Sequence, residues 1–476
     1  MTEDINLPEE IVSNGIFAED GEYGLALDQD SMYTIALEGM QQAVATKAEL
    51  TLGLPPSLER YAARFDRVRW GIIIPEQPTP EEAHHLEILQ PLVKHRQELM
   101  WGKSALSLSY KDGWTVDDFL WDEGERGISR GKMNPEIIPY YLTIVAPPDR
   151  ISWEFQQELS QDYAVGRIWF DDPDDCQRYI ERLLENEKGE LNQAGREALF
   201  IGPQFPGDKA TALSSNMLVK KAADWLDNND EFEITVSLWE VGQEGHQPTK
   251  TNLIKRLSGK GLDDQAQTPP SLIFAGTHGL EFRNGSQGQH AMQGALLMQE
   301  WPGPKTKPEA GHFVSSQDIQ QDFGLSGSMG FLFACYSAGM PLYQDWAPEV
   351  PVRLTDKPFV ARLPQKLMAN GMLALIGHVS KAWGYSFMGV RETKAEIDYF
   401  TEPIGELLRG APVGHATSYL NEGVLHLIAM MRSELEQPGK YPRNLVNSTW
   451  LAYRDLKGYV VLGDPAVRIS EPLTRD

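Results

Sequence analysis

Cysteine is scarce in this sequence, and its scarcity excludes two kinds of architecture. Only Cys176 and Cys335 occur among 476 residues. A disulfide framework or a zinc cluster needs several cysteines at short, regular spacings, so neither is available. Cys176 lies in the acidic stretch DDPDDCQRYIERLL. Because nearby carboxylates raise a thiol pKa, we interpret Cys176 as a bystander.

Basic residues and long apolar runs are also in short supply. The chain has 68 Asp and Glu against 43 Lys and Arg, a formal net charge of -25. Nucleic acid and anionic membranes require a clustered basic face, so we expect neither as a partner. No apolar run reaches the roughly 18 residues of a membrane span. The stretch MTEDINLPEEIVSNG has neither a basic start nor an apolar core, so we expect a cytoplasmic protein.

The ordinary apolar fraction of 41% is sufficient for a sizeable core, and short apolar runs alternate with helical patterns from residue 61 onward. The expected strands are VRWGIII (68–74), YYLTIVAPP, YAVGRIWF, ALFIG (198–202), EFEITVSLW, LIFAG, GFLFA, MLALIG and YVVLGDPAVRI. The expected helices are 79–99, DPDDCQRYIERLLENEKG, and segments near 213–227, 248–257, 315–322, 362–370, 389–409 and 415–436. Continuous apolar strands between helices predict an α/β protein with a mostly parallel sheet covered on both faces. We expect an irregular or partly helical lead-in (1–60), a first α/β half (61–190) and a second, catalytic half (195–476).

Two of these strands each deliver a reactive residue to their carboxyl end. In LIFAGTHGLEF (272–282) the apolar run leads to His278, and in GFLFACYSAG (330–339) it leads to Cys335, 57 residues later. That spacing allows one helical crossover connection between two parallel strands, which would bring the carboxyl ends of both strands to the same edge of the sheet. Singly, the histidine is more often a structural group and the cysteine a small core hydrophobe. Together they favour nucleophilic catalysis, in which a base activates the thiol and backbone N–H groups stabilise the oxyanion.

The order THG, FACYSAG, ALIGHVSKAWGYSF, VLGDPAVRI resembles the gingipain-type branch of the caspase-like cysteine peptidases. The upstream stretch DYAVGRIWFDDPDDCQRYIERLLENEKG is similar to the same family, and the resemblance runs from about residue 65 to 470. It implies a caspase-like three-layer αβα sandwich. It also implies a cysteine endopeptidase that cleaves peptide bonds through an acyl-enzyme, a chemistry that requires no metal or other cofactor. The secreted members of the family carry a leader that this sequence lacks, so we expect a role in regulated intracellular proteolysis.

The resemblance also implies roles for particular residues. His278 would be the general base and acid, and Cys335 the nucleophile. The backbone N–H groups of Gly279 and Cys335 would form the oxyanion hole. Trp383 would be an aromatic wall of the pocket for the residue before the scissile bond, although an ordinary packed aromatic is the alternative.

The sequence departs from the family at two positions. Family members carry an acidic residue that selects a basic side chain and a glutamate that orients the histidine. Aligning FIGPQFPGDKATALSSNMLVKKAADWL puts Ser214 or Ser215 at the first position and Gln204 at the second. A hydroxyl cannot neutralise a buried cation, which argues against a strongly charged pocket. Asp208, six residues before Ser214, is the alternative source of charge.

Three functions therefore stay open at the level of sequence. The first is a peptidase that takes a protein or peptide substrate. The second is a catalytically silent caspase-like module that binds a partner through its acidic surface. The third is a cysteine acyltransferase or transpeptidase, which differs in whether water or an amine accepts the acyl group. An activating or inhibitory protein partner is compatible with each of them.

Overall fold

One large sheet runs through both expected halves of the chain. The computed structural model describes residues 10–45, 61–124, 133–190, 194–242, 245–347, 351–388, 396–469 and 471–475. Within them, ten strands form a sheet in the order β5-β4-β6-β7-β18-β17-β14-β10-β8-β9. In that order the strands are Leu106–Tyr110, Trp70–Pro75, Tyr141–Ile144, Ala164–Arg167, Tyr459–Gly463, Ala374–His378, Met329–Phe333, Pro270–Gly276, Gly195–Gly202 and Thr235–Glu240. The first half supplies β5, β4, β6 and β7, and the second half supplies the others.

The strand directions divide this sheet into two parallel blocks. Neighbouring strands are parallel from β5 to β18 and again from β17 to β9. The pair β17 and β18 is antiparallel, so the two blocks run in opposite directions. The carboxyl ends of β10 and β14 therefore lie at one edge, and those of β4, β6 and β7 at the opposite edge. The α/β class with a mostly parallel sheet is confirmed.

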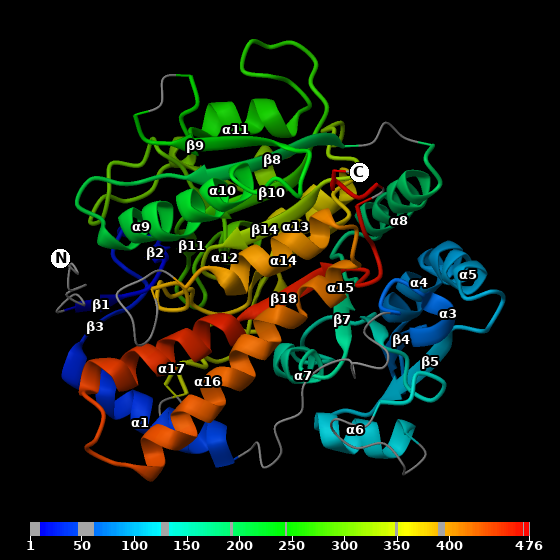
Figure 1. The fold of residues 1–476 in the computed structure, drawn as a ribbon, viewed down its shortest axis with the longest axis horizontal. Coiled ribbons are helices and arrows are strands. Elements are labelled where there is room, and N and C mark those ends of the chain that lie inside the picture. The colour runs from blue at the N-terminus through cyan, green and yellow to red at the C-terminus, as the bar shows by residue number, and fades with distance from the viewer. Residues whose placement is uncertain are drawn as a thin grey trace.

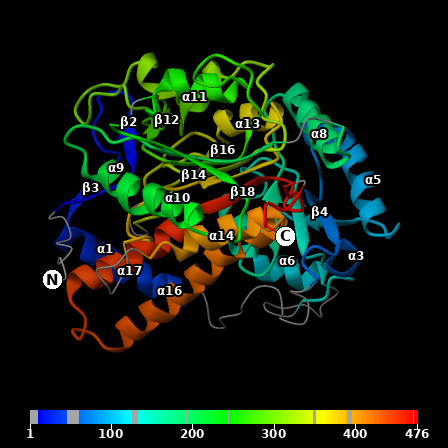
Figure 2. The same cartoon turned by 45° about the horizontal axis from the view of Figure 1, so that its top comes forward.

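Helices cover both faces of the sheet, which gives the three-layer arrangement that we expected. Figure 2 shows α11 and α13 on one side of β14, and α10 and α14 on the other. The helices of the first half are α3 (Phe65–Val68), α4 (Pro80–Ile88), α5 (Gln90–Leu99), α6 (Val116–Glu123), α7 (Trp153–Leu159) and α8 (Pro173–Glu187). Those of the second half are α9 (Lys209–Leu213), the π-helix η1 (Ser214–Val219), α10 (Lys220–Asp227), α11 (Lys250–Leu257), α12 (Gln289–Met292), η2 (Ala310–His312), η3 (Ser316–Asp318), α13 (Arg362–Ala369), α14 (Asp398–Leu408), α15 (Val413–Ala416), α16 (Ser418–Glu436) and α17 (Arg443–Lys457). None of the helices in the described ranges combines the length and apolarity needed to cross a membrane.

The expected lead-in is ordered structure over residues 10–45, while 1–9 and 46–60 lie outside the described residues. It contains β1 (Glu10–Val12), β2 (Gly15–Phe17), β3 (Ala26–Asp28) and α1 (Gln29–Ala45). Strands β1 and β3 pair with each other. Helix α1 packs against α16 and α17, at the opposite end of the sequence (Figure 1). Strand β2 is the edge of a small sheet, β13-β12-β11-β2, with β11 (Gly279–Glu281), β12 (Leu296–Leu297) and β13 (Phe313–Val314). A further pair, β15 (Gly339–Met340) and β16 (Phe359–Val360), is antiparallel.

The helix boundaries depart from expectation at three places. The segment 79–99 is two helices, α4 and α5, because Pro91 cannot continue the hydrogen-bond ladder of α4. Thr79 and Glu82 form the capping box that starts α4. The prediction of a helix near 315–322 is wrong, since only the short 3₁₀ turn η3 forms there. The helix expected over 389–409 begins at Asp398, and 389–395 lie outside the described residues.

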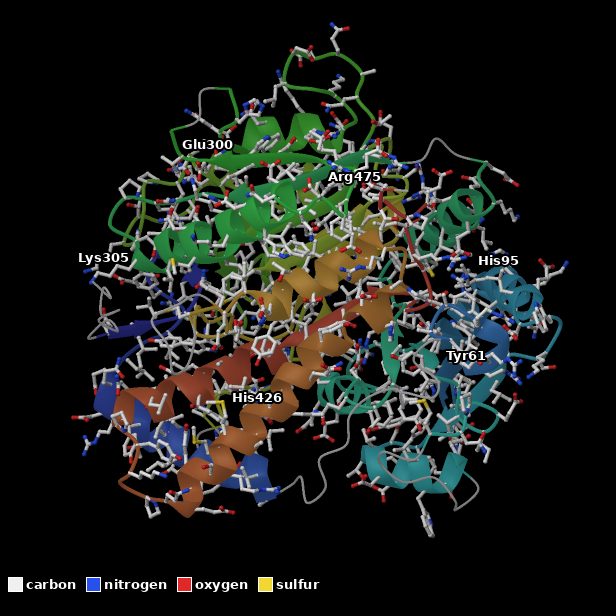
Figure 3. All side chains as sticks on the ribbon, viewed as in Figure 1. Tyr61, His95, Glu300, Lys305, His426 and Arg475 are labelled. Atoms are coloured by element: carbon white, nitrogen blue, oxygen red, sulfur yellow. The ribbon has the colours of Figure 1, made fainter. Side chains whose placement is uncertain are left out.

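A buried ionic network links the first half to the end of the second. Arg96 on α5 donates two hydrogen bonds to Glu187 at the end of α8, both 2.7 Å, and one to Asp464 after β18, 2.8 Å. Trp70 on β4 also donates to Asp464, at 3.0 Å. Burial acts to raise the pKa of Glu187, but Arg96 and His95 lower it to about 2. Figure 3 shows His95 and Tyr61 in the first half, while Glu300 and Lys305 lie at the far side of the second half.

Candidate active site

Strands β10 and β14 bring His278 and Cys335 to one edge of the sheet. The strands are adjacent and parallel, and Gly276 is paired with Phe333. His278 and Cys335 each lie two residues beyond that pair, and Thr277 N–H still donates to Phe333 C=O at 3.1 Å. The apolar runs form the strands, and the polar residues follow where each strand ends. Both side chains are fully buried, with 0% of their surface exposed.

Asp208 holds one nitrogen of the His278 ring. Nε2 of His278 lies 2.7 Å from Oδ2 of Asp208. Asp208 is the N-cap of α9, and it also accepts hydrogen bonds from Thr211 and from the Tyr23 hydroxyl, the latter at 2.7 Å. Burial acts to raise the pKa of Asp208, but His278, Thr211 and Tyr23 together hold it well below its usual value. Asp208 is therefore a carboxylate that accepts the Nε2–H of His278.

The second ring nitrogen of His278 is available for proton transfer. Nδ1 is buried and has no hydrogen-bond partner among the residues described. Phe205 stacks on the ring with centroids 5.9 Å apart, and Trp301 meets it edge-on at 6.0 Å. The Asp208 contact fixes the tautomer, and the two aromatic rings fix the plane. Nδ1 is thus presented as the atom that accepts a proton.

Cys335 is buried beside polar and charged groups. The N–H of Ala382 donates to its sulfur at 3.1 Å. Burial raises the pKa of Cys335 well above its usual value, and the Glu281 carboxylate raises it further, while Lys381 and the Ala382 N–H act in the opposite direction. Glu281 and Lys381 form a buried ion pair of 2.5 Å. With its surroundings closed in this way, the sulfur is a neutral thiol.

Gly279 lies where only a glycine fits. A Cβ at this position would come within 2.0 Å of the Cys335 carbonyl oxygen and 2.9 Å of the Cys335 nitrogen. The two backbone segments that were expected to supply the oxyanion hole therefore touch. The Gly279 N–H is already engaged, because it donates to the Asn14 carbonyl at 3.0 Å.

The residues expected to line the substrate pocket or to orient His278 do not all make the contacts that the family resemblance implies. Gln204 does not contact His278; its side chain donates to Ser215, 3.1 Å, and to Asn216, 3.2 Å. The expectation that Gln204 orients the histidine is therefore corrected, since Asp208 makes that contact. With its oxygens engaged by His278, Tyr23 and Thr211, Asp208 is in turn not placed to neutralise a substrate cation.

Both serines lie on η1, in different settings. Ser215 turns inward and donates to the Gly202 carbonyl at 2.8 Å. Ser214 faces the N-terminal segment, where its hydroxyl accepts from the Asn14 side chain at 3.4 Å. Of the two serines, Ser214 is thus the one that contacts the Asn14 side chain.

Trp383 is fully buried, with 0% exposure. Its backbone N–H donates to the Asp455 carboxylate at 2.7 Å, which fixes the loop that carries Ala382 beside Cys335. The cavity of about 390 Å³ next to Asn14 is lined by the following residues, Gly384 and Tyr385, and not by Trp383. The expected aromatic wall is therefore a packed core residue that holds the loop in place.

The N-terminal segment covers this site. Gly15 on β2 pairs in parallel register with Gly279 on β11, and Asn14 N–H donates to the Ala382 carbonyl at 3.0 Å. A Cβ on Gly15 would lie 1.8 Å from a Glu281 carboxylate oxygen and 3.0 Å from the Cys335 sulfur. Backbone from the start of the chain therefore passes directly over the thiol.

Comparison with known proteins finds similarity only among solved structures, since no family model and no curated protein matches this sequence. One is described as "Structure of Protease", with 13% identity, a TM-score of 0.49, and coverage of 84% of this chain and 78% of that one. Two are crystal structures of the Saccharomyces cerevisiae separase–securin complex, with 11% and 12% identity and TM-scores of 0.33 and 0.31. The alignments with those two cover 91% of this chain and 22% of theirs. None of these similarities identifies the substrate or the reaction of this chain.

Sequence reasoning missed two components of the site. Asp208 was considered only as a source of charge for the substrate pocket, because its partner His278 lies 70 residues away and no local pattern connects them. The covering strand β2 is only three residues long, GIF, and is too short to show a period. The Pro-Gly-Asp sequence at 206–208 was the one available signal, because aspartate before a helix is a strong N-cap. Among the described residues, no group of three or more His, Cys, Asp or Glu side chains is placed to hold a metal ion.

Proposed function

We propose that this protein is a cysteine peptidase with Cys335 as nucleophile and His278 as general base and acid. One observation carries the proposal. His278 has Nε2 fixed by Asp208 and Nδ1 without a partner in the described structure, at the strand end next to that of Cys335. A base oriented by a carboxylate beside a nucleophile is the general arrangement for acyl transfer.

The reaction follows from these groups. His278 takes the thiol proton as the sulfur attacks the carbonyl carbon of the scissile bond, and a C–S bond forms. The oxyanion is stabilised by the N–H groups of Gly279 and Cys335. The C–N bond then breaks, and the leaving amine takes the proton from His278. Water, deprotonated by His278, hydrolyses the thioester and restores the thiol.

Asp208 supports this cycle through charge and position. When His278 carries two protons, the imidazolium lies 2.7 Å from a buried carboxylate, which stabilises it. Lys381 is a buried cation that acts to lower the pKa of the Cys335 thiol, and it is paired with the Glu281 carboxylate, which acts to raise it. Formation of the Cys335 thiolate therefore depends on the His278–Asp208 pair and on the Lys381–Glu281 pair.

The test is labelling by peptidyl electrophiles that vary the residue before the cut. The panel is applied to the full chain and to Gly15→Ala, in which the new methyl group would clash with the Glu281 carboxylate, so that the covering segment or the Glu281 side chain must shift. We expect labelling of Cys335, its loss in Cys335→Ala and in His278→Ala, and full retention in Cys176→Ala. Cys176 is the matched control, because it is equally buried but lies on α8 in the first half.

Two results would contradict the proposal or refine it. If no probe labels Cys335 in either chain, while a small thiol reagent reaches it after unfolding, the fold serves as a binding module. If labelling occurs and added amines accept the acyl group in preference to water, the protein is an acyltransferase with the same dyad.

A further inference from the structure

The N-terminal segment occupies the active site in the manner of a substrate. Resting on the proposed function, we propose that Asn14 takes the place of the residue before the scissile bond. The segment then blocks the site, and the uncovered enzyme prefers asparagine at that position of its peptide substrates.

The backbone of Asn14 makes the contacts that a bound substrate requires. Its carbonyl accepts the Gly279 N–H at 3.0 Å, and that N–H is the proposed oxyanion donor. Its own N–H donates to the Ala382 carbonyl at 3.0 Å, and the Ala382 N–H in turn holds the Cys335 sulfur. Both main-chain groups of one residue are thus anchored to the two backbone segments that flank the thiol.

The next residue continues along the same track. Gly15 pairs with Gly279, and the strand runs on beside β11 to Phe17. The place of a Gly15 Cβ is 3.0 Å from the sulfur, so the Asn14–Gly15 peptide bond lies beside Cys335. With this segment in position, neither Cys335 nor His278 exposes any surface.

The asparagine side chain enters a pocket suited to an amide. It is 1% exposed, and its amide nitrogen meets the Ser214 hydroxyl at 3.4 Å. The adjoining cavity of about 390 Å³ has further walls from Ala210, Leu213, Gly384, Tyr385 and Met388. A hydroxyl can pair with an amide, whereas it cannot compensate a guanidinium.

Charged groups near this pocket do not favour a basic substrate residue. Asp208 has its oxygens engaged by His278, Tyr23 and Thr211. Glu10 lines the cavity but is exposed and belongs to the covering segment, so it leaves with that segment. Lys209 also lines the cavity and is exposed, and it would repel a second cation.

The experiment compares full-length variants on three matched fluorogenic peptides, Val-Ser-Asn, Val-Ser-Arg and Val-Ser-Asp amides. The first reproduces residues 12–14. The methyl group of Gly15→Ala would overlap the Glu281 carboxylate and come within 3.0 Å of the Cys335 sulfur, so the covering segment or the Glu281 side chain must shift. Gly311→Ala is the control, since nothing lies within 4 Å of its new methyl group. Arg283→Ala is a second, milder variant that removes the ion pairs from Arg283 to Glu19 and Asp20. It provides the readout if thermal melting shows that Gly15→Ala does not fold.

We expect kcat/KM on the Asn peptide to rise about tenfold or more in Gly15→Ala, to rise less in Arg283→Ala, and to stay unchanged in Gly311→Ala. In the folded Gly15→Ala variant, kcat/KM on the Asn peptide should exceed kcat/KM on the Arg and Asp peptides by about tenfold or more. Equal activity of all folded variants would overturn the proposal that the N-terminal segment blocks the site. A preference for the Arg peptide would overturn the proposal that the pocket selects asparagine. Either result can occur while Cys335 is still labelled, so the proposed function would survive. Loss of all Cys335 labelling would instead remove the function on which this inference rests.

Discussion

At the scale of single residues, the contact between His278 and Asp208 gives this site its chemical character. A buried imidazole can point either nitrogen at the thiol, and it can rotate out of plane. The Asp208 carboxylate selects one tautomer, and because its pKa is held low, it stays charged throughout the neutral range. The same carboxylate caps α9, so the orientation of the base is tied to the start of a helix.

Asp208→Asn should leave the fold intact and slow the proposed reaction strongly. An amide can donate to Nε2, which favours the wrong tautomer and gives no charge to the imidazolium. We expect kcat to fall on the order of 10²- to 10⁴-fold with little change in KM, by analogy with carboxylate-to-amide changes in hydrolase triads. The measurement is steady-state kinetics on the Asn peptide in the Gly15→Ala background.

Gln204→Ala is the matched control for Asp208→Asn. Gln204 lies near the same helix start but contacts Ser215 and Asn216, not His278. We expect less than about a threefold change in kcat. Equal losses in both variants would contradict the positioning role of Asp208.

At this scale the sequence could predict that His278 and Cys335 end neighbouring strands, but not what surrounds them. His278 and Cys335 were recognisable because each follows a strongly apolar run, a pattern contained within about ten residues. The contact of Asn14 with Gly279 joins segments 265 residues apart, and nothing in either segment encodes the other. Tertiary contacts of this kind depend on the whole chain.

At the scale of elements, buried apolar strands were the predictable part of the fold. Strands β10, β14 and β17 were expected because each contains a short apolar run. In the structure each of them is buried along its length. Strand β5, LSLSY, was missed because it is an edge strand that alternates with serine. The sequence 315–322 was wrongly assigned a helix because its acidic and amide residues are helix-compatible, whereas Ser315 caps only one short turn.

The network of Arg96, Glu187 and Asp464 should dominate the coupling between α5, α8 and β18. In Asp464→Ala the Arg96 guanidinium loses one of its two buried carboxylates, and Trp70 loses its acceptor. Removing one partner of such a group typically costs about 3–5 kcal/mol. We expect a fall of that size in the free energy of unfolding, measured by urea denaturation.

An exposed ion pair provides the comparison for Asp464→Ala. Arg196 and Glu233 lie 2.8 Å apart, but their side chains are 44% and 67% exposed. Glu233→Ala should therefore change the free energy of unfolding by less than about 1 kcal/mol. If Asp464→Ala costs no more than Glu233→Ala, the network does not couple these elements.

At the scale of the whole molecule, buried thiols and phenols set the response to alkali. Burial raises the pKa of Cys176, Cys335, Tyr141, Tyr336 and Tyr459 above the usual values. In the unfolded chain these groups ionise near pH 8.5 for cysteine and near pH 10 for tyrosine. The unfolded state therefore loses protons that the folded state keeps, and stability falls as pH rises.

We expect the urea midpoint of unfolding to be constant near neutral pH and to fall steadily from about pH 8.5 to about pH 11. Cys176→Ala should flatten the first part of this decline, since it removes one buried thiol outside the site. A midpoint that is unchanged up to about pH 11 would contradict the retention of these protons in the folded state.

The position of β18 sets the order in which the chain can be completed during synthesis. This strand is formed by residues 459–463 yet lies between β7 and β17, in the middle of the large sheet. Until residues 459–463 have been synthesised, the nascent chain holds two incomplete sheets, each with an unpaired edge that can pair with other strands. The edge carrying His278 and Cys335 belongs to one of these incomplete sheets, so we expect this candidate site to become fully supported only after residues 459–463 have been made and paired.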